Sequence, residues 1–181
     1  MAMQWLRNLI RVARVMARGR EHRFDLVRAL GRRPALLLAT GAAEFGGIVS
    51  NRVPATLKML AELRVASMVG CEFCLDIGAA LAEYQQLDRT QLVELAEFET
   101  SEAFSDDDRL VLRFATALSE RSPVVTPELR TAMEKRFSKA QIVELAAAVA
   151  REHQRSRFYM GIDLPPSRFA SDGACRVAPV R

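Results

Sequence analysis

The feature that most constrains the fold of this chain is a succession of helix start and stop signals with no convincing strand between them. Pro34 and Pro54 each precede an apolar segment, and proline suits the first turn of a helix because its φ is fixed near the helical value. Gly70 supplies a stop, since glycine readily adopts the left-handed conformation that ends a helix. We therefore expect an all-α domain. The predicted helices span residues 34–48, 54–69, 71–86, 90–98, 109–119, 127–136 and 139–158.

The composition fits a single domain with a substantial core. Of the 181 residues, 50% are hydrophobic and 27% are charged, which argues against wholesale disorder. Nine Gly and seven Pro lie scattered without a period, so a collagen-like chain is excluded. The most apolar stretch, residues 35–49, is interrupted by Glu44 and is shorter than the roughly 20 residues of a membrane span. We expect a cytoplasmic protein without a membrane span.

The formal charge of +4 is concentrated at the N-terminus. Residues 1–33 carry nine Arg against Glu21 and Asp25, whereas the rest of the chain holds 17 basic and 20 acidic side chains. Residues 1–20 of this basic arm are predicted to form an amphipathic helix. Its apolar side carries Trp5, Leu9, Val12 and Met16.

Three interpretations of the basic arm stay open. The arm can pack on its own domain or a neighbouring subunit, remain a solvated basic helix, or lie on a membrane surface. Arg11 and Arg14 interrupt the place where the apolar segment of a secretory signal would stand. Nucleic-acid binding is disfavoured, because the arginines come without interleaved aromatic residues or a recognisable binding module. We favour the packed arm.

A pair of cysteines three residues apart carries the clearest chemistry. Cys71 and Cys74 follow the helix-ending Gly70 and begin the next predicted helix. Residues three apart lie on one face of a helix, so the two sulfurs come within bonding reach. The free N–H groups and the positive dipole end of that helix favour thiolate over thiol. The sequence thus predicts a redox-active dithiol in a reducing compartment.

Two other interpretations of the pair stay open. Paired cysteines can be inert small core residues. They can also be half of a zinc site, but only Cys175, His22 and His153 remain as sulfur or imidazole donors, and none stands at a second motif spacing. We therefore expect neither a metal nor another cofactor. The helical context also argues against a thioredoxin-like domain, whose motif accompanies a βαβ pattern.

Residues 57–82, LKMLAELRVASMVGCEFCLDIGAALA, resemble the core motif of the carboxymuconolactone decarboxylase superfamily, which includes the alkylhydroperoxidase D-like proteins. The shared features are a helix with Leu-Arg-Val-Ala, a Gly-Cys-x-x-Cys turn and a following helix. Residues 122–158 and the segment GIDLPPSRF resemble the C-terminal helices and tail of such proteins. The resemblance implies a compact helical domain over residues 34–163, between the basic arm of residues 1–33 and an irregular tail of residues 164–181.

The resemblance also implies an activity and an assembly. Peroxidase members reduce hydroperoxides with the two cysteines, through a sulfenic acid that is resolved to a disulfide, and a partner thiol such as a lipoylated protein then supplies electrons. Decarboxylase members act on a lactone acid and need not have the pair. Members usually assemble as trimers or hexamers, often from dimers, so a homo-oligomer is expected. Retention of Cys71 and Cys74 favours the redox branch.

The chain departs from the peroxidase pattern at both positions of the proton relay. Peroxidase-type members place a histidine four residues after the second cysteine, where this chain has Gly78. They carry a glutamate twelve residues before the first cysteine, where this chain has Met59. A proton acceptor near a thiol raises its thiolate fraction and later protonates the leaving alkoxide. The inherited mechanism therefore needs other residues.

Three residues are candidates to replace the missing relay. Glu62 lies three residues beyond Met59 on the same predicted helix and can reach a similar space, with a surface ion pair as the alternative. Asp76 follows Cys74 by two residues, and a purely electrostatic role at the helix start is its alternative. His153 supplies an imidazole if the last helix packs against the cysteine turn. Candidates for an anionic-substrate pocket or an oligomer contact are Arg155, Arg157 and Tyr159.

The sequence thus favours a thiol-dependent oxidoreductase of the alkylhydroperoxidase type with an atypical proton relay. Cys74 is expected to attack the peroxide, and Cys71, as the cysteine nearer solvent, to exchange with the reductant. One alternative is a lyase or hydrolase for a small carboxylated ring, in which the cysteines are incidental. Another is a non-catalytic redox sensor. The expected ligand is a small hydroperoxide or carboxylated molecule, not a nucleic acid.

Overall fold

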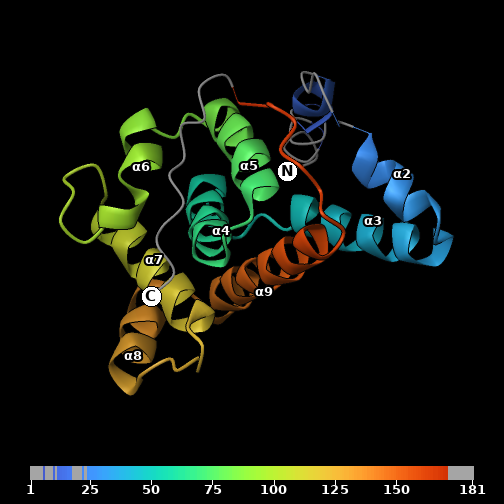
Figure 1. Cartoon of the computed structure of the whole chain (residues 1–181). Helices are drawn as coiled ribbons and strands as arrows, with labels where there is room; N and C mark the ends of the chain where they lie inside the picture. The colour runs from blue at the N-terminus through green and yellow to red at the C-terminus, as the bar shows by residue number, and fades with distance from the viewer. Residues whose placement is uncertain (1–5, 7–9, 11, 18–21, 23, 171–181) are drawn as a thin grey trace.

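The computed structural model describes residues 6, 10, 12–17, 22 and 24–170, and every regular element among them is helical (Figure 1). The all-α prediction is therefore confirmed for this part of the chain. The elements are α2 (Asp25–Gly31), α3 (Pro34–Val49), α4 (Ala55–Val69), α5 (Glu72–Tyr84), α6 (Arg89–Val93), the 3-10 helix η1 (Leu95–Glu97), α7 (Asp106–Ser119), α8 (Pro127–Arg136) and α9 (Lys139–Gly161).

The helix boundaries follow from the capping residues that the sequence supplies. Pro34 occupies the first turn of α3, and Gly70 ends α4 with a φ of 81°. The side chains of Ser105, Thr126 and Ser138 each accept a hydrogen bond from a backbone N–H three residues further on. These local interactions satisfy backbone groups that a helix start would otherwise leave unpaired.

Residues 90–98, which the sequence predicts as one helix, instead lie in α6 and η1. Leu92, Leu95 and Phe98 are buried at intervals of three residues. A 3-10 helix has three residues per turn and keeps such a row on one side, whereas an α-helix would rotate it away from the core. The prediction of a single helix is wrong because the core requires this tighter row.

α4 lies at the centre of the domain and packs against α5, α7 and α9 (Figure 1). It is buried on more than one side and contributes to both hydrophobic clusters of the core. Leu60 and Leu63 belong to the cluster that includes residues of α5, while Ala61 and Val65 belong to the cluster shared with α7 and α9. Packing on both sides fixes α4, and with it the turn that follows at Gly70.

α3 differs from the other long helices because none of its residues is buried. Leu38 is 74% exposed and Phe45 is 51% exposed. α2 and α3 lie together at one edge of the domain (Figure 1). Polar contacts attach the end of α3, where the Lys58 ammonium donates to the backbone carbonyls of Gly47 and Ser50. Among the described residues, no helix combines the length and the apolar character needed to cross a membrane.

Parts of both terminal regions pack on the helical domain. Residues 12–17 are helical, and Val15 is fully buried in the cluster that also contains the cysteine pair. This burial agrees with an arm packed on its own domain, whereas Trp5 and Leu9, on which the amphipathic prediction also relied, lie outside the described residues. Residues 164–170 have no regular structure. The proposed domain boundaries stay predictions.

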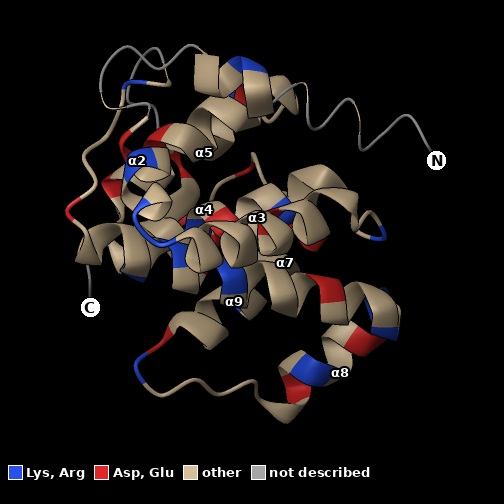
Figure 2. Ribbon diagram, turned by 90° about the vertical axis from the view of Figure 1, so that its right-hand side faces the viewer, with Lys and Arg blue, Asp and Glu red and all other residues tan. Residues whose placement is uncertain are grey.

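Charged side chains of both signs lie close together on α8 (Figure 2). Arg136 at the end of α8 pairs with Asp107 in the first turn of α7, and Arg113 pairs with Glu99. Hydrogen bonds from these guanidinium groups lower the pKa of Asp107 and of Glu99. Such exposed pairs contribute little free energy. The first links α8 to α7, and the second links α7 to the segment after η1.

The turn before the cysteines should depend on glycine at position 70. Gly70→Ala is expected to lower the free energy of unfolding by about 1–2 kcal/mol, because a Cβ is unfavourable at a φ of 81°. Gly41→Ala is the control, since no atom lies within 4 Å of the added Cβ in α3. It should raise the free energy of unfolding by about 0.5–1 kcal/mol through better helix propensity. Urea denaturation measures both, and effects of the same sign would contradict this account.

Candidate active site

The two cysteines lie at the start of α5, directly after the turn at Gly70. Cys71 is the N-cap residue of α5 and has extended backbone geometry, while Cys74 lies in the first turn. Their Cα atoms are 5.3 Å apart, and a disulfide joins the sulfurs. The backbone N–H of Cys74 donates a hydrogen bond to Cys71 Sγ at 3.2 Å. The predicted bonding reach of the pair is thus confirmed.

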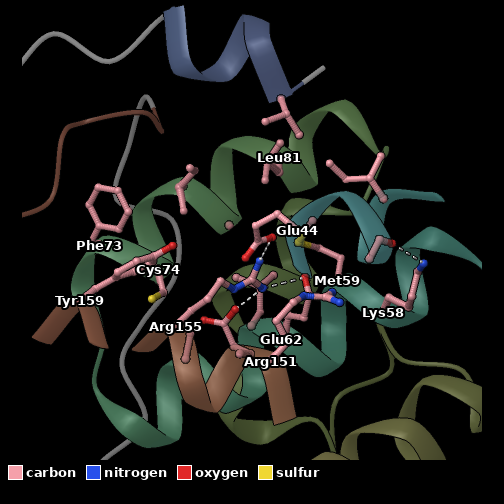
Figure 3. A pocket seen from close by; sticks show the side chains of 18 of the residues that line it. Glu44, Lys58, Met59, Glu62, Phe73, Cys74, Leu81, Arg151, Arg155 and Tyr159 are labelled. Atoms are coloured by element: carbon pink, nitrogen blue, oxygen red, sulfur yellow. Dashed lines mark hydrogen bonds and ion pairs between the residues drawn. The ribbon is translucent and has the colours of Figure 1, made fainter. Parts of the chain in front are cut away.

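A cavity of about 290 Å³ lies beside Cys74, between α3, α4, α5 and α9 (Figure 3). Cys74 lines this cavity, as expected for a residue that meets a substrate. Cys71 is 1% exposed and Cys74 is 6% exposed, so the expectation that Cys71 lies nearer solvent is wrong. The backbone explains the difference, because the N–H of Cys71 donates to the carbonyl of Ala66 and draws Cys71 against the end of α4.

The wall of the cavity near the sulfur is mostly apolar. Phe73 and Tyr159 pack edge to face with ring centroids 5.3 Å apart, and they join the wall of α5 to that of α9. Such a surface suits the organic part of a small ligand. The other apolar side chains that line it include Ile48, Met59, Leu63, Ile77 and Leu81.

Both positions of the missing family relay lie on this wall, and neither carries a group that transfers protons. Met59 is buried in the core cluster. At Gly78, an added Cβ would lie 2.7 Å from Leu63 Cδ2. The end of the Leu63 side chain would therefore have to move to admit a side chain at position 78. Glycine at position 78 thus lets Leu63 of α4 approach α5 closely.

Arg155 joins carboxylates from three helices at the polar end of the cavity (Figure 3). Its guanidinium contacts Glu44 of α3 at 3.0 Å, Glu62 of α4 at 3.4 Å, and Glu152 one turn earlier on α9. Arg151 adds an ion pair with Glu62 at 2.6 Å. Burial alone would lower the pKa of Arg155, but the carboxylates hold it well above its ordinary value. The guanidinium is thus charged and already paired.

Glu152 connects this charged cluster to the dithiol. Burial raises the pKa of Glu152 to about 7, although the charge of Arg155 opposes the shift. Ser156 Oγ lies 3.1 Å from a carboxylate oxygen of Glu152 and 3.4 Å from Cys74 Sγ. Polar contacts therefore run without a break from Arg155 to the sulfur.

Sequence reasoning did not single out Glu152 and Ser156. Both continue the buried row of α9 that includes Leu145 and Val149 and reaches Tyr159, at alternating intervals of three and four residues. An acid and a hydroxyl in such a row are a usable signal, because buried polar groups need a polar partner inside the fold. The identity of that partner depends on which helices meet, and the sequence does not reveal it.

One of the three predicted relay substitutes lies at the cavity. Glu62 lines it, and two arginines hold its carboxylate. His153 instead faces α7, where its Nε2 lies 2.9 Å from Ser119 Oγ. Burial and the charge of Arg157 lower the pKa of His153, so its imidazole is neutral. No cluster of three or more His, Cys, Asp or Glu side chains suited to a metal ion occurs in the described part of the chain.

Asp76, the third candidate, ties the C-terminal segment to α5. Its carboxylate accepts hydrogen bonds from the backbone N–H groups of Ser167, Phe169 and Ala170 at 2.9, 3.1 and 3.0 Å. The same contacts place Phe169 edge to face against Phe73, with ring centroids 5.9 Å apart. Asp76 thus supports the wall of the cavity from behind, and this placement gives no support to a role at the sulfur.

A curated protein shares sequence with the chain, although no protein-family model matches it. The uncharacterized protein YnjA of Escherichia coli strain K12 is 31% identical over 125 residues. The matched region covers 69% of this chain and 66% of YnjA, so the chain spans just under two thirds of that relative's length.

Solved structures share the fold. The debrominase Bmp8 without ligand gives a TM-score of 0.73 at 22% identity, over 80% of this chain and 78% of that one. A cysteine-to-alanine variant of Bmp8 in complex with 2,3,4-tribromopyrrole gives 0.71 at 22% identity, over 77% and 75%. ATU0492 from Agrobacterium tumefaciens, a protein of unknown function provisionally identified as the antioxidant defence protein AhpD, gives 0.72 at 18% identity, over 76% and 94%. The resemblance noted in the sequence is confirmed at the level of the fold.

Glu152 is expected to make the protein less stable as the pH rises from about 5 to about 8. A carboxyl group with a pKa of about 7 in the fold, against 4.5 ordinarily, binds more protons when folded, so the free energy of unfolding falls across this window. Glu152→Gln removes the dependence. Its stability relative to the wild type should improve by about 2.5 kcal/mol between these two pH values in urea denaturation.

Glu144→Gln is the matched control for this measurement, because Glu144 is also a buried acid of α9. Burial would raise the pKa of Glu144, but hydrogen bonding to Lys58 and its charge bring the value below normal. Its titration therefore lies below the window, and the difference between this variant and the wild type should stay constant between about pH 5 and 8. A constant difference for Glu152→Gln as well would show that Glu152 is ionised throughout.

Proposed function

We propose that this chain, which has the alkylhydroperoxidase D-like fold and is a homologue of YnjA, is a thiol-dependent oxidoreductase that reduces organic hydroperoxides. The observation that carries the proposal is the position of Cys74, which lines an apolar cavity while its sulfur bonds to that of Cys71. A dithiol beside a space for a small molecule can accept an oxygen atom from a peroxide and close to a disulfide.

The oxidative half-reaction begins at Cys74. Its thiolate attacks the terminal oxygen of the hydroperoxide, so that an S–O bond forms while the O–O bond breaks. The alkoxide leaves with the electron pair and takes up a proton to become an alcohol. The Cys71 thiol then attacks the sulfenic acid of Cys74, and hydroxide leaves with the Cys71 proton as water. Two thiols and one hydroperoxide thus give a disulfide, an alcohol and water.

The reductive half-reaction requires an external dithiol that reaches the disulfide. Both sulfurs are nearly enclosed, and Cys74 is the one that lines the cavity. The reductant is therefore expected to enter through the cavity and attack Cys74, rather than Cys71 as the sequence suggested. A slender dithiol such as the lipoyl arm of a partner protein suits this route, and it becomes a disulfide as the cysteines regain their thiols.

The cavity favours an organic peroxide over a carboxylated substrate. Burial raises the pKa of Tyr159 to about 12, so its phenol keeps its proton and can donate a hydrogen bond to a substrate oxygen. The expected role of Arg155 in binding an anion is not favoured, because Glu44, Glu62 and Glu152 already surround it. A lyase or hydrolase for a carboxylated ring would lack a free cation at this position.

Reductive debromination is a second candidate, because Bmp8, which shares the fold, is a debrominase. The apolar wall beside Cys74 suits a small aromatic ring. In this reaction a ring carbon would gain a thiol proton in place of bromine, and bromide would leave with the second proton. The two thiols would supply two electrons and end as the same disulfide. The two candidates therefore differ in substrate and not in the sulfur chemistry.

Self-association and location belong to the same proposal. The outer side of α3 exposes Leu36, Leu38 and Phe45, while Ile48 of α3 lines the cavity. A homo-oligomer, as the sequence resemblance implies, would cover this apolar surface next to the site. A cytoplasmic location agrees with a disulfide that must be reduced again after each turnover.

The proposal predicts distinct outcomes for the two cysteines. With reduced protein and one equivalent of cumene hydroperoxide, the wild type should consume the peroxide and form the disulfide. Cys74→Ser should consume none, because the attacking sulfur is absent. Cys71→Ser should consume the peroxide and accumulate a sulfenic acid that dimedone traps. Cys175→Ser is the cysteine control and should behave as the wild type. Peroxide assay and mass mapping measure these outcomes.

Other results would identify the alternatives. Undiminished peroxide consumption in both Cys71→Ser and Cys74→Ser would eliminate the dithiol mechanism. A reversible disulfide without multiple turnovers in excess dihydrolipoamide would indicate a redox sensor. Release of bromide from 2,3,4-tribromopyrrole that requires Cys74 would favour the second candidate. Activity on a carboxylated ring that survives alkylation of the thiols would indicate a lyase or hydrolase.

A further inference from the structure

Ser156 stands between a buried acid and the redox sulfur. It lies one helical turn after Glu152 on α9, with its Oγ 3.1 Å from the Glu152 carboxylate and 3.4 Å from Cys74 Sγ. Ser156 is 0% exposed and Glu152 is 4% exposed, so solvent does not replace either contact. The three groups form a hydrogen-bonded line inside the protein that ends at the sulfur of the dithiol.

The direction of this line depends on the protonation of Glu152, because a hydroxyl has only one hydrogen to donate. When Glu152 is ionised, Ser156 donates to the carboxylate, and its oxygen is free to accept the hydrogen of a Cys74 thiol. When Glu152 is protonated, its O–H donates to Ser156, and Ser156 donates to the sulfur. The same atoms can therefore remove a proton from the site and return it.

We propose that Ser156 and Glu152 are the proton relay of the dithiol, with Ser156 as the catalytic residue in contact with the sulfur and Glu152 acting through it. They fill the role that Met59 and Gly78 leave open. The inference rests on the proposed function only in taking Cys74 as the attacking sulfur.

The charges around Glu152 suit a group that changes protonation near neutrality. Arg155 on the same helix stabilises its carboxylate, while Glu62 of α4 and Glu44 of α3 add negative charge to the same cluster. Tyr159 on α9 stays a neutral phenol. Burial outweighs the arginine, so the pKa of Glu152 lies at about 7. A general acid–base group works best when its pKa is close to the working pH.

The proton balance of the oxidative half-reaction closes with these two residues. Ser156 accepts the thiol proton of Cys74 as it passes its own hydroxyl proton to the Glu152 carboxylate. The thiolate then attacks the hydroperoxide, and the alkoxide that leaves takes a proton back from the relay. Glu152 returns to its carboxylate form, so the relay neither gains nor loses a proton over the step.

The test is the pH dependence of Cys74 reactivity in the full chain. In a parent with Cys71→Ser and Cys175→Ser, Cys74 is the one remaining thiol, and its alkylation by iodoacetamide reports its thiolate fraction. The parent rate should rise in a step near pH 7, where Glu152 ionises. In Ser156→Ala and in Glu152→Gln this step should vanish. The alkylation rate should then rise at about pH 8.5, the ordinary pKa of a thiol. At neutral pH the rate should fall roughly tenfold.

Matched variants distinguish the relay from a structural effect. Ser119→Ala removes a serine that contacts His153, and Glu144→Gln removes a buried acid of α9 that pairs with Lys58. Both should keep the parent profile. The double variant at Ser156 and Glu152 should be no slower than either single variant, because each change breaks the same line. A uniform slowing at every pH, additive effects, or an unchanged step in folded variants would each overturn the relay.

The relay and the proposed function fail separately in this design, because alkylation involves no peroxide. A normal pH step in a chain that reduces no hydroperoxide would keep the relay and reject the peroxidase. In the otherwise native chain, Ser156→Ala should slow hydroperoxide consumption at neutral pH by at least roughly tenfold. Wild-type consumption by that variant would reject the relay and keep the dithiol enzyme.

Discussion

The guanidinium of Arg155 lies among the carboxylates of Glu44, Glu62 and Glu152, and it links the acids of three helices at the polar end of the cavity. Without it, Glu44 and Glu152 would lose these ion pairs in a buried space, where desolvation disfavours ionisation. The contact also reaches α3, which buries no residue of its own and so gains little from apolar packing. Arg155 therefore holds α3 against the core together with Lys58, which donates to Gly47 and Ser50.

The same sharing of charge leaves Glu152 able to titrate. An acid buried without a cation would stay protonated at neutral pH, and an acid with an arginine to itself would stay ionised. Arg155 is divided among three carboxylates, so its effect on Glu152 is partial and burial prevails, which gives a pKa of about 7. The ion-pair cluster thus leaves Glu152 as an acid–base group, and the hydroxyl of Ser156 connects it to the sulfur of Cys74.

The sequence predicts this protein well wherever the signal is local. Pro34, Gly70 and the serine and threonine caps determine helix ends from their immediate neighbours, and the spacing of the cysteines determines their bonding reach. Prediction from the sequence fails where the answer depends on which faces of two helices pack together. His153 and Glu152 are adjacent on α9, yet one residue turns a helix by about 100°, so the acid faces the cavity and the imidazole faces Ser119. Chemical type favoured the imidazole, whereas the row of buried residues identifies the acid.

Met59 and Gly78 lie on α4 and α5, whereas Ser156, which contacts Cys74, lies on α9. A methyl group of Leu63 lies beside Gly78, so a larger side chain at position 78 would require Leu63 to move. α9 is the other helix whose buried row reaches Cys74, and Ser156 is the residue of that row in contact with the sulfur. The proposed proton relay thereby lies on α9, while α4 and α5 supply most of the apolar wall beside Cys74. The wall of α4 and α5 can change to suit the organic part of a substrate without altering the groups that control the thiol.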